Sequence, residues 1–263
     1  MSPTVVLVTG ANRGIGYEIV KALIQSPLPY KIFLAARDPS KGQAAASSLQ
    51  PLINPLTAAN NQTSISVVQL DVSSPESIQA AAEQVRQEAG RLDVLVNNAG
   101  IVDQSSDPLL RLRNTLEINT IGPFAVTQAF KPLLKIQPEG EGEEQPKVKR
   151  IIHVSSGLGS IGERLNPKGA YYGLGAPEYR MSKAALNMLA ACDAYELRDD
   201  GVKVFAYDPE FVATSLTGTP EERRKMGALE PSVSAESCLE IIEGKRDAET
   251  NKFLSIRGKD WPW

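Results

Sequence analysis

Short apolar, β-branched runs alternate along the chain with longer segments of helical periodicity, and this alternation restricts the possible folds more than any other feature. The runs lie at residues 5–8, 31–35, 64–70, 94–96, 151–154 and 202–206, and a shorter one lies near 253–256. Strands without polar alternation are typical of parallel sheets that helices cover on both faces. We therefore predict an α/β fold with a doubly wound parallel sheet and right-handed crossovers.

The length of 263 residues and the 42% share of hydrophobic residues are those of an ordinary globular chain with a sizeable core. α/β sheets of this size commonly form one unit, so we expect a single domain over residues 1–263. Two segments interrupt the alternation, the Pro- and Asn-rich residues 51–63 and the Glu-rich residues 138–150. We interpret both as surface loops, and residues 138–150 as an insertion. Because residues 138–150 carry many charges, a partner-binding patch is the alternative interpretation of that segment.

Charge and cysteine content argue against several classes of protein. The formal net charge is −3 and the basic residues are scattered, so no cationic face for nucleic acid is expected. No group of His, Cys or carboxylate side chains has metal-ligand spacing, and Cys192 and Cys238 are interpreted as reduced thiols. The first residues resemble neither a signal peptide nor a membrane span, so we expect a cytoplasmic protein without membrane contact.

A glycine-rich turn follows the first apolar run and precedes a helical segment. Glycines allow a tight turn and a close approach to a pyrophosphate, which free amides and the positive end of the helix then stabilise. A purely structural turn is the alternative, but the position directly after a strand favours a dinucleotide site. The residues expected to bind the cofactor here are Gly10, Asn12, Arg13, Gly14, Ile15 and Gly16.

The second run ends at Arg37, where folds that prefer NAD place an acidic residue on the ribose. Arg37, helped by Arg13, is suited to the 2′-phosphate of NADP, which predicts NADPH/NADP+ as the cofactor. Two surface arginines without a ligand are the alternative. Further cofactor contacts are expected where the third and fourth runs end, at Asp71, Val72, Asn98, Ala99 and Gly100.

Polar residues with catalytic spacing follow the fifth run. Ser155 and Ser156 come at its end, and Tyr179 and Lys183 lie four positions apart on a helical segment, hence on one face. A nearby ammonium lowers the pKa of a phenol, which is otherwise a poor proton donor near neutral pH. The same spacing recurs at Tyr17, where no serine-bearing strand end comes before it, and we interpret that copy as coincidence.

Asn119 lies in a predicted long helix over residues 109–134. Pro123 follows four residues later and has no amide hydrogen to give to the Asn119 carbonyl, so the helix should kink there. A carbonyl left free beside a cleft can hold a water molecule, whereas a helix broken for packing alone is the alternative. His153, the only histidine, lies in the fifth run and is interpreted as a core residue.

Taken together these motifs resemble, in order and over nearly the whole chain, the short-chain dehydrogenase/reductase family, and the tail at 260–263 adds a likeness to carbonyl-reductase-like members of the fungal and C-factor type. The resemblance implies a single-domain Rossmann fold with seven parallel strands and catalysis by hydride transfer. It implies that Tyr179 protonates the substrate oxygen and that Ser156, rather than Ser155, hydrogen-bonds it. Lys183 would hold the nicotinamide ribose and lower the pKa of the tyrosine, and Asn119 would anchor a proton-relay water.

The segment after the sixth run departs from the family pattern. Pro209, Val212 and Thr214 match the family's cofactor segment, whose valine and threonine contact the nicotinamide, but Glu210 replaces a glycine. If the position requires a positive φ, glutamate is strained there. Alternatively its carboxylate lies near the pocket and favours a cationic substrate such as an amine or iminium.

The 23 positions from Ser156 to Tyr179 exceed the family's usual spacing. We expect residues 157–178, together with 215–231, to form lid loops over the substrate. Tyr171 and Tyr172 in the first loop are candidate substrate contacts, which would suit an apolar or aromatic molecule.

These observations predict an NADPH-dependent oxidoreductase that reduces a small-molecule ketone or aldehyde. A C=N (imine or iminium) reductase or cyclase in secondary metabolism is the enzymatic alternative. A third hypothesis is an NADP(H)-sensing protein without turnover. The complete Ser-Tyr-Lys-Asn set argues against it. The resemblance allows a homodimer, a homotetramer or a monomer.

Overall fold

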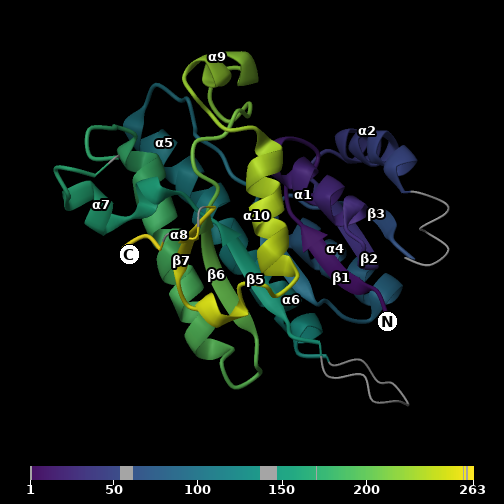
Figure 1. Cartoon of the computed structure of the whole chain (residues 1–263). Coiled ribbons are helices and arrows are strands. Elements are labelled where there is room, and N and C mark those ends of the chain that lie inside the picture. Colours follow the sequence, from purple (N-terminus) through teal and green to yellow (C-terminus); the bar gives the residue numbers. More distant parts are fainter. Residues whose placement is uncertain (1, 54–61, 137–146, 170, 257, 259) are drawn as a thin grey trace.

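The structure is a computed structural model that describes residues 2–53, 62–136, 147–169, 171–256, 258 and 260–263. A seven-stranded sheet crosses the molecule between two layers of helices (Figure 1). All neighbouring strands are parallel, in the order β3-β2-β1-β4-β5-β6-β7. Their bounds are β1 (Thr4–Val8), β2 (Tyr30–Ala36), β3 (Ser64–Gln69), β4 (Val94–Asn97), β5 (Arg150–Val154), β6 (Lys203–Asp208) and β7 (Phe253–Ser255). The predicted doubly wound, single-domain Rossmann fold is confirmed.

Each face of the sheet carries its own apolar core. Because successive side chains of a strand point to opposite faces, Val6 and Val8 of β1 belong to one core and Val5 and Leu7 to the other. The first core includes α1 (Gly14–Gln25), α2 (Pro39–Leu49) and α10 (Pro231–Ile242), and the second includes α4 (Pro75–Ala89), α6 (Gly122–Leu134) and α8 (Pro177–Glu196). Both faces of the central strands are therefore covered, which explains their uninterrupted apolar sequences.

The helix expected over residues 109–134 is interrupted close to Asn119. The chain forms α5 (Pro108–Leu116), then a π-helical turn (Glu117–Ile121), and then α6, with Pro123 in its first turn. The Gly122 amide donates to the Glu117 carbonyl, five residues back. The predicted irregularity is confirmed, and it takes the form of one wide turn rather than a simple kink. Such turns are frequent at functional sites.

The two expected lid loops contain short elements. Residues 157–178 include a 3₁₀ turn (Gly157–Gly159) and α7 (Ile161–Leu165), and residues 215–231 include α9 (Pro220–Lys225). Two further 3₁₀ turns occupy Gln50–Leu52 and Asp247–Glu249. Of the two predicted surface loops, residues 54–61 and 137–146 lie outside the described residues, as does Ala170 in the first lid.

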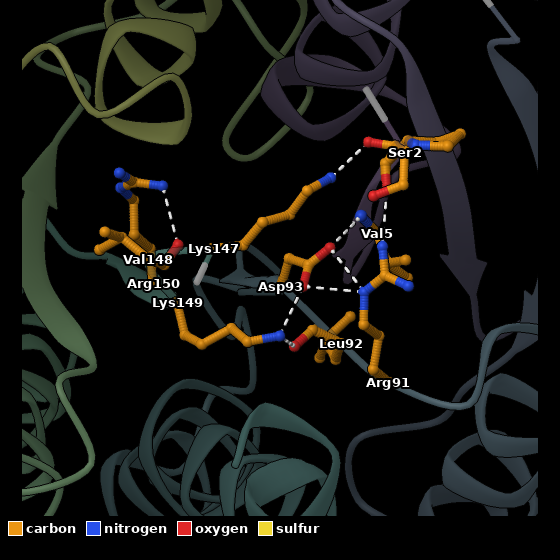
Figure 2. A network of polar contacts seen from close by, with 10 residues as sticks. Ser2, Val5, Arg91, Leu92, Asp93, Lys147, Val148, Lys149 and Arg150 are labelled. Carbon is orange, nitrogen blue, oxygen red and sulfur yellow. Dashed lines mark hydrogen bonds and ion pairs between the residues drawn. The ribbon is translucent and has the colours of Figure 1, made fainter. Parts of the chain in front are cut away.

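A buried charge network ties together the strands' amino ends (Figure 2). The Asp93 carboxylate, fully buried before β4, accepts the Val5 amide at 2.8 Å and the Lys149 ammonium at 2.6 Å. Arg91 adds a longer contact at 3.2 Å. Lys149, at the end of the predicted 138–150 loop, is therefore buried and holds the start of β5 against β4 and β1.

Within the described part of the chain, no helix has the length and apolar character needed to cross a bilayer. The same residues contain no group of three His, Cys, Asp or Glu side chains placed to hold a metal ion. Cys192 is exposed, Cys238 is buried, and both are free cysteines.

Candidate active site and cofactor cleft

One cleft of about 780 Å³ takes in nearly all of the predicted site. It lies where β1, β2, β4, β5 and β6 end, at the carboxyl edge of the sheet, where open α/β sheets bind ligands. The predicted cofactor residues in its lining are Gly10, Asn12, Arg13, Gly14, Ile15, Arg37, Asp71, Val72, Asn98, Ala99, Gly100, Tyr179, Lys183, Pro209, Val212 and Thr214. Sequence positions far apart are thus brought together as expected.

The glycine turn has the backbone shape that a phosphate cradle requires. Gly10 and Gly14 adopt φ values of +64° and +60°, which L side chains rarely adopt. Gly16 lies outside the lining, and its role is a close approach: a Cβ there would stand 2.5 Å from Asn98 Nδ2. Arg13 at the N-cap of α1 makes no side-chain cap, so that side chain leaves the first-turn amides available to a ligand. These residues fit a pyrophosphate.

The lining beyond the end of β2 is basic. Arg37 is joined by Lys41, which the sequence analysis missed because it belongs to no motif. The neighbouring carboxylate, Asp38, caps α2 by accepting the amides of Ser40 at 2.9 Å and Lys41 at 3.3 Å. Asp38 also pairs with the Lys41 ammonium at 3.8 Å, so Arg37 is the cation in excess there, and this suits a phosphate better than ribose hydroxyls.

Three of the four predicted catalytic residues, Ser156, Tyr179 and Lys183, line the cleft, and Asn119 does not. The Ser156 hydroxyl lies close enough to the Tyr179 phenol to lower its pKa. Lys183 follows one turn later on α8, its Nζ 5.7 Å from the centre of the Tyr179 ring and 2.8 Å from the Val154 carbonyl that it donates to. Ser155 is buried and donates to Asn187 Oδ1 at 2.5 Å. The geometry therefore favours Ser156 over Ser155 as the serine that acts with the tyrosine.

Burial dominates the electrostatics of this cluster. It raises the pKa of Tyr179 above its usual range, and the nearby Asp208 carboxylate raises it further, while the Ser156 hydroxyl and the Arg223 guanidinium lower it. Burial also lowers the pKa of Lys183 to about 8, against the opposing effect of Asp208. The cation that lowers the tyrosine's pKa in this structure is thus Arg223, and not Lys183 as expected.

The direction of the Lys183 side chain explains why it does not lower the pKa of Tyr179. Its ammonium donates to a backbone carbonyl and lies over the ring of Tyr179. Arg223 comes from α9 in the second lid, where no motif marks it, and it lines the same cleft. Its Nε donates to the Val212 carbonyl at 2.8 Å, and its guanidinium lies 4.5 Å from the Phe211 ring centre.

Asn119 is fully buried in the π turn and its side chain is committed to structure. Its Oδ1 accepts the Ile101 amide at 2.8 Å, and its Nδ2 donates to the Ile101 carbonyl at 2.9 Å and to Ser182 Oγ at 3.1 Å. Asn119 thereby fixes the chain that leaves β4 against α8. Its side chain is therefore not the group that would hold the predicted water.

Glu210 adopts the left-handed conformation expected of the glycine it replaces, with φ at +62°. It lines the cleft, as do Pro209 and Val212 on either side of it. Both lid segments also contribute lining residues: Leu158, Tyr171, Leu174 and Ala176 from the first, and Ser215, Leu216, Thr217 and Arg223 from the second. Tyr172 is 45% exposed and lies outside the lining, so the structure brings only Tyr171 of the two tyrosines to the cleft.

Two residues lie away from the cleft, as interpreted from the sequence. His153 is fully buried in β5, with Nε2 3.1 Å from Asp193 Oδ2 and Nδ1 3.3 Å from Asn97 Nδ2. Tyr17, of the second Tyr-Lys pair, shares a hydrogen bond of 2.9 Å with the Ser48 hydroxyl. Neither lines the cleft.

The chain is similar to known proteins over its whole length. The family model described as short chain dehydrogenase matches residues 4–225. The chain is 37% identical to the short-chain dehydrogenase/reductase eupG of a Phoma species, over 98% of this chain and 97% of that protein, and 33% identical to tropE of Talaromyces stipitatus, over 98% and 97%. Among solved structures, the NADPH-bound carbonyl reductase from chicken fatty liver shares 33% identity over the full length of both chains, with a TM-score of 0.80. The chain belongs to the short-chain dehydrogenase/reductase family.

Proposed function

We propose that this chain is an NADPH-dependent oxidoreductase that reduces a ketone or aldehyde. The observation that carries the proposal is that Ser156 and Tyr179, with Lys183 one turn along α8, line the same cleft as Arg37. The chicken carbonyl reductase, which is described as NADPH-bound, supports the choice of cofactor and substrate class.

The chain's own residues fit the cofactor in three places. When bound, the nicotinamide supplies the hydride that reduces the substrate carbon. Residues 10–16 and the amino end of α1 would hold the pyrophosphate, and Arg37 with Lys41 would hold the 2′-phosphate. Pro209, Val212 and Thr214 would line the nicotinamide.

Tyr179 would act as the proton donor. Because burial raises its pKa, the phenol is protonated before the reaction. As the substrate carbon is reduced, its oxygen gains negative charge and takes the phenol's proton, while the Ser156 hydroxyl donates a hydrogen bond to the same oxygen. The guanidinium of Arg223 would stabilise the phenolate that remains, Lys183 would hold the nicotinamide ribose, and a water on the Asn119 carbonyl would return the proton.

The test is cofactor oxidation with NADPH, and with NADH in parallel, against ketones, aldehydes, quinones and cyclic imines. Tyr179→Phe removes the proton donor and should lower turnover by roughly 10²–10⁴-fold. Tyr17→Phe is the matched control, because Tyr17 has the same spacing to a lysine but lies outside the cleft. NADPH binding without turnover on any of these classes would overturn carbonyl reduction and favour the NADP(H)-sensing alternative.

Reduction of a C=N bond is the second candidate function. The observation that favours it is Glu210 in the cleft lining, where a carboxylate would stabilise a cationic iminium or amine. Arg223 lines the same cleft and would disfavour that charge. Faster turnover of cyclic iminium compounds than of ketones, lost in Glu210→Gly, would support this candidate; equal activity of that variant on charged and neutral substrates would exclude a role for Glu210.

Exposed apolar side chains on the helices near the site are relevant to whether the chain forms oligomers. Large apolar side chains are exposed on α5, α6 and α8 and on the π turn: Leu109, Leu110, Ile121, Phe124, Met181 and Met188. A homodimer or homotetramer would cover them, whereas a monomer would leave them in water. We propose a cytoplasmic enzyme with a small-molecule partner, and a mass measurement in solution decides between the assemblies.

A further inference from the structure

The carboxylate of Asp208 is buried at the end of β6, only 1% exposed, behind the cleft rather than in its lining. It accepts two hydrogen bonds: Oδ1 accepts the Glu210 amide at 3.0 Å, and Oδ2 accepts the Trp261 indole N–H at 2.8 Å. The backbone of Gly157 lies beside the same carboxylate and lowers its pKa. A Cβ on Gly157 would stand 3.0 Å from Oδ2, which shows how closely that backbone approaches.

The two donors and the neighbouring Gly157 come from three separate parts of the active site. Gly157 directly follows the catalytic Ser156. Glu210 lies between Pro209 and Val212, which line the cleft, and the hydrogen bond to Oδ1 holds its amide in the left-handed turn. Trp261 belongs to the tail of the chain. One carboxylate therefore sets the positions of the serine turn and the proposed nicotinamide turn relative to each other.

The tail is in turn fastened to the first lid. The Ser160 hydroxyl donates to the Pro262 carbonyl at 2.5 Å, and the Gly162 amide donates to the Trp263 carbonyl at 3.1 Å. The ring of Trp261 lies 5.3 Å from that of Tyr171, centre to centre. The tail thus reaches Asp208 at one side and lid residues at the other.

Asp208 also acts on the catalytic charges. Its negative charge raises the pKa of both Tyr179 and Lys183 on α8. Glu210, beyond the end of its own strand, faces Asp208 with a like charge, and Tyr207 beside it is a neutral phenol whose pKa is raised well above its usual range. Burial raises the pKa of Asp208 itself to about 6, so the carboxylate is ionised near neutral pH.

We propose that Asp208 is a positioning residue for the reaction, and that Trp261 makes the C-terminal tail a working part of the active site by anchoring that carboxylate. The inference rests on the proposed function, because the turns that Asp208 holds are those assigned to the substrate oxygen and the nicotinamide.

Two substitutions test whether Asp208 and Trp261 position the active site. Asp208→Asn keeps an acceptor for Glu210 but turns an NH₂ group toward the indole donor of Trp261 and the backbone of Gly157. Trp261→Phe removes only the indole donor and keeps a ring beside Tyr171. Trp263→Phe is the matched control, since its ring stacks on Phe253 and is 45% exposed. Thermal unfolding first establishes that each variant is folded.

Cofactor binding supplies a readout that needs no substrate. Asp208→Asn should weaken NADPH binding by about tenfold, the loss typical of one hydrogen bond to a charged group, and Trp261→Phe should weaken it less. Adenosine 2′,5′-bisphosphate, which reaches only the Arg37 end, should bind all variants equally. If NADPH binds wild type but binds Asp208→Asn equally well, the inference is overturned; if NADPH does not bind wild type, the proposed function fails instead.

The pH profile separates positioning from mere support of the fold. With the substrate that turns over fastest, wild-type kcat/KM should fall as pH drops through about 6, because Asp208 becomes protonated and one of its N–H donors then loses its acceptor. In Asp208→Asn this acidic limb should vanish. The alkaline limb should move to lower pH, because Lys183 loses the charge that raises its pKa. Unchanged limbs in a folded variant would contradict the proposal.

Discussion

Lys183 is a buried cation whose charge depends on pH within the working range. Burial lowers its pKa from 10.5 to about 8, so the ammonium is present below that pH and is lost above it. We predict that kcat/KM, which reports the free enzyme, declines above about pH 8.

Lys183→Arg is the informative variant, because a guanidinium keeps its charge throughout this range. Its rate should be lower, since the fork of arginine does not reproduce the ammonium's contact with Val154, but its profile should stay flat where wild type declines. An alkaline limb of the same midpoint in Lys183→Arg would assign that limb to another group.

Arg37 carries the second prediction at this scale. Arg37→Asp should raise the KM for NADPH by about 10–100-fold, because a hydrogen-bonded cation beside the 2′-phosphate is replaced by an anion. The KM for NADH should change little or improve, since a carboxylate suits ribose hydroxyls. Lys21→Met serves as the control, because Lys21 lies on α1 outside the cleft. Equal losses for both cofactors would show that Arg37 supports the loop and does not read the phosphate.

Some residues of the candidate site could be predicted from the sequence and others could not. Tyr179 and Lys183 were predictable because their spacing places them on one helix face, whereas the strand end offered both Ser155 and Ser156 and only the family resemblance chose Ser156. Arg223 and Asp208 were not, because their roles arise from contacts made across the fold, such as the one between Asp208 and Trp261, 53 positions apart. No spacing rule covers a tail that folds back onto a strand end.

At the scale of elements, apolar runs predicted the strands and their carboxyl-edge loops well, because strand burial is a local pattern. The helix over 109–134 was predictable as irregular from Pro123, but not as a π turn. Its form depends on a contact between distant segments: a Cβ on Gly122 would stand 2.9 Å from Val72 Cγ2 and 3.0 Å from the Val72 carbonyl.

That contact predicts the effect of Gly122→Ala. The added methyl group must push the start of α6 away from Val72, which lines the cofactor cleft. We expect a loss of about 1–3 kcal/mol in the free energy of unfolding, typical of overpacking, together with weaker NADPH binding. Urea unfolding and cofactor titration measure the two effects. Gly173→Ala, with nothing within 4 Å of the added Cβ, should change the free energy of unfolding by far less.

Over the whole molecule, the two edges of the sheet have different tasks. The carboxyl edge holds the cleft, a left-handed glutamate and buried groups with shifted pKa values. The amino edge is closed by the network of Asp93, Lys149 and Arg91 (Figure 2). Stability and chemistry should therefore respond to different substitutions.

Lys149→Met tests this separation. Asp93 would stay buried with the Val5 amide and the longer Arg91 contact, so we expect a loss of about 3–5 kcal/mol in the free energy of unfolding, as for other broken buried pairs. Adding Asp93→Leu should recover part of that loss, because the fully buried carboxylate is removed; the rest stays lost, since Arg91 then has no carboxylate and the Val5 amide no acceptor. For each variant that is still folded at the assay temperature, kcat and NADPH affinity per folded molecule should equal wild type. A fall in kcat without a fall in stability would show that the amino edge is coupled to the site.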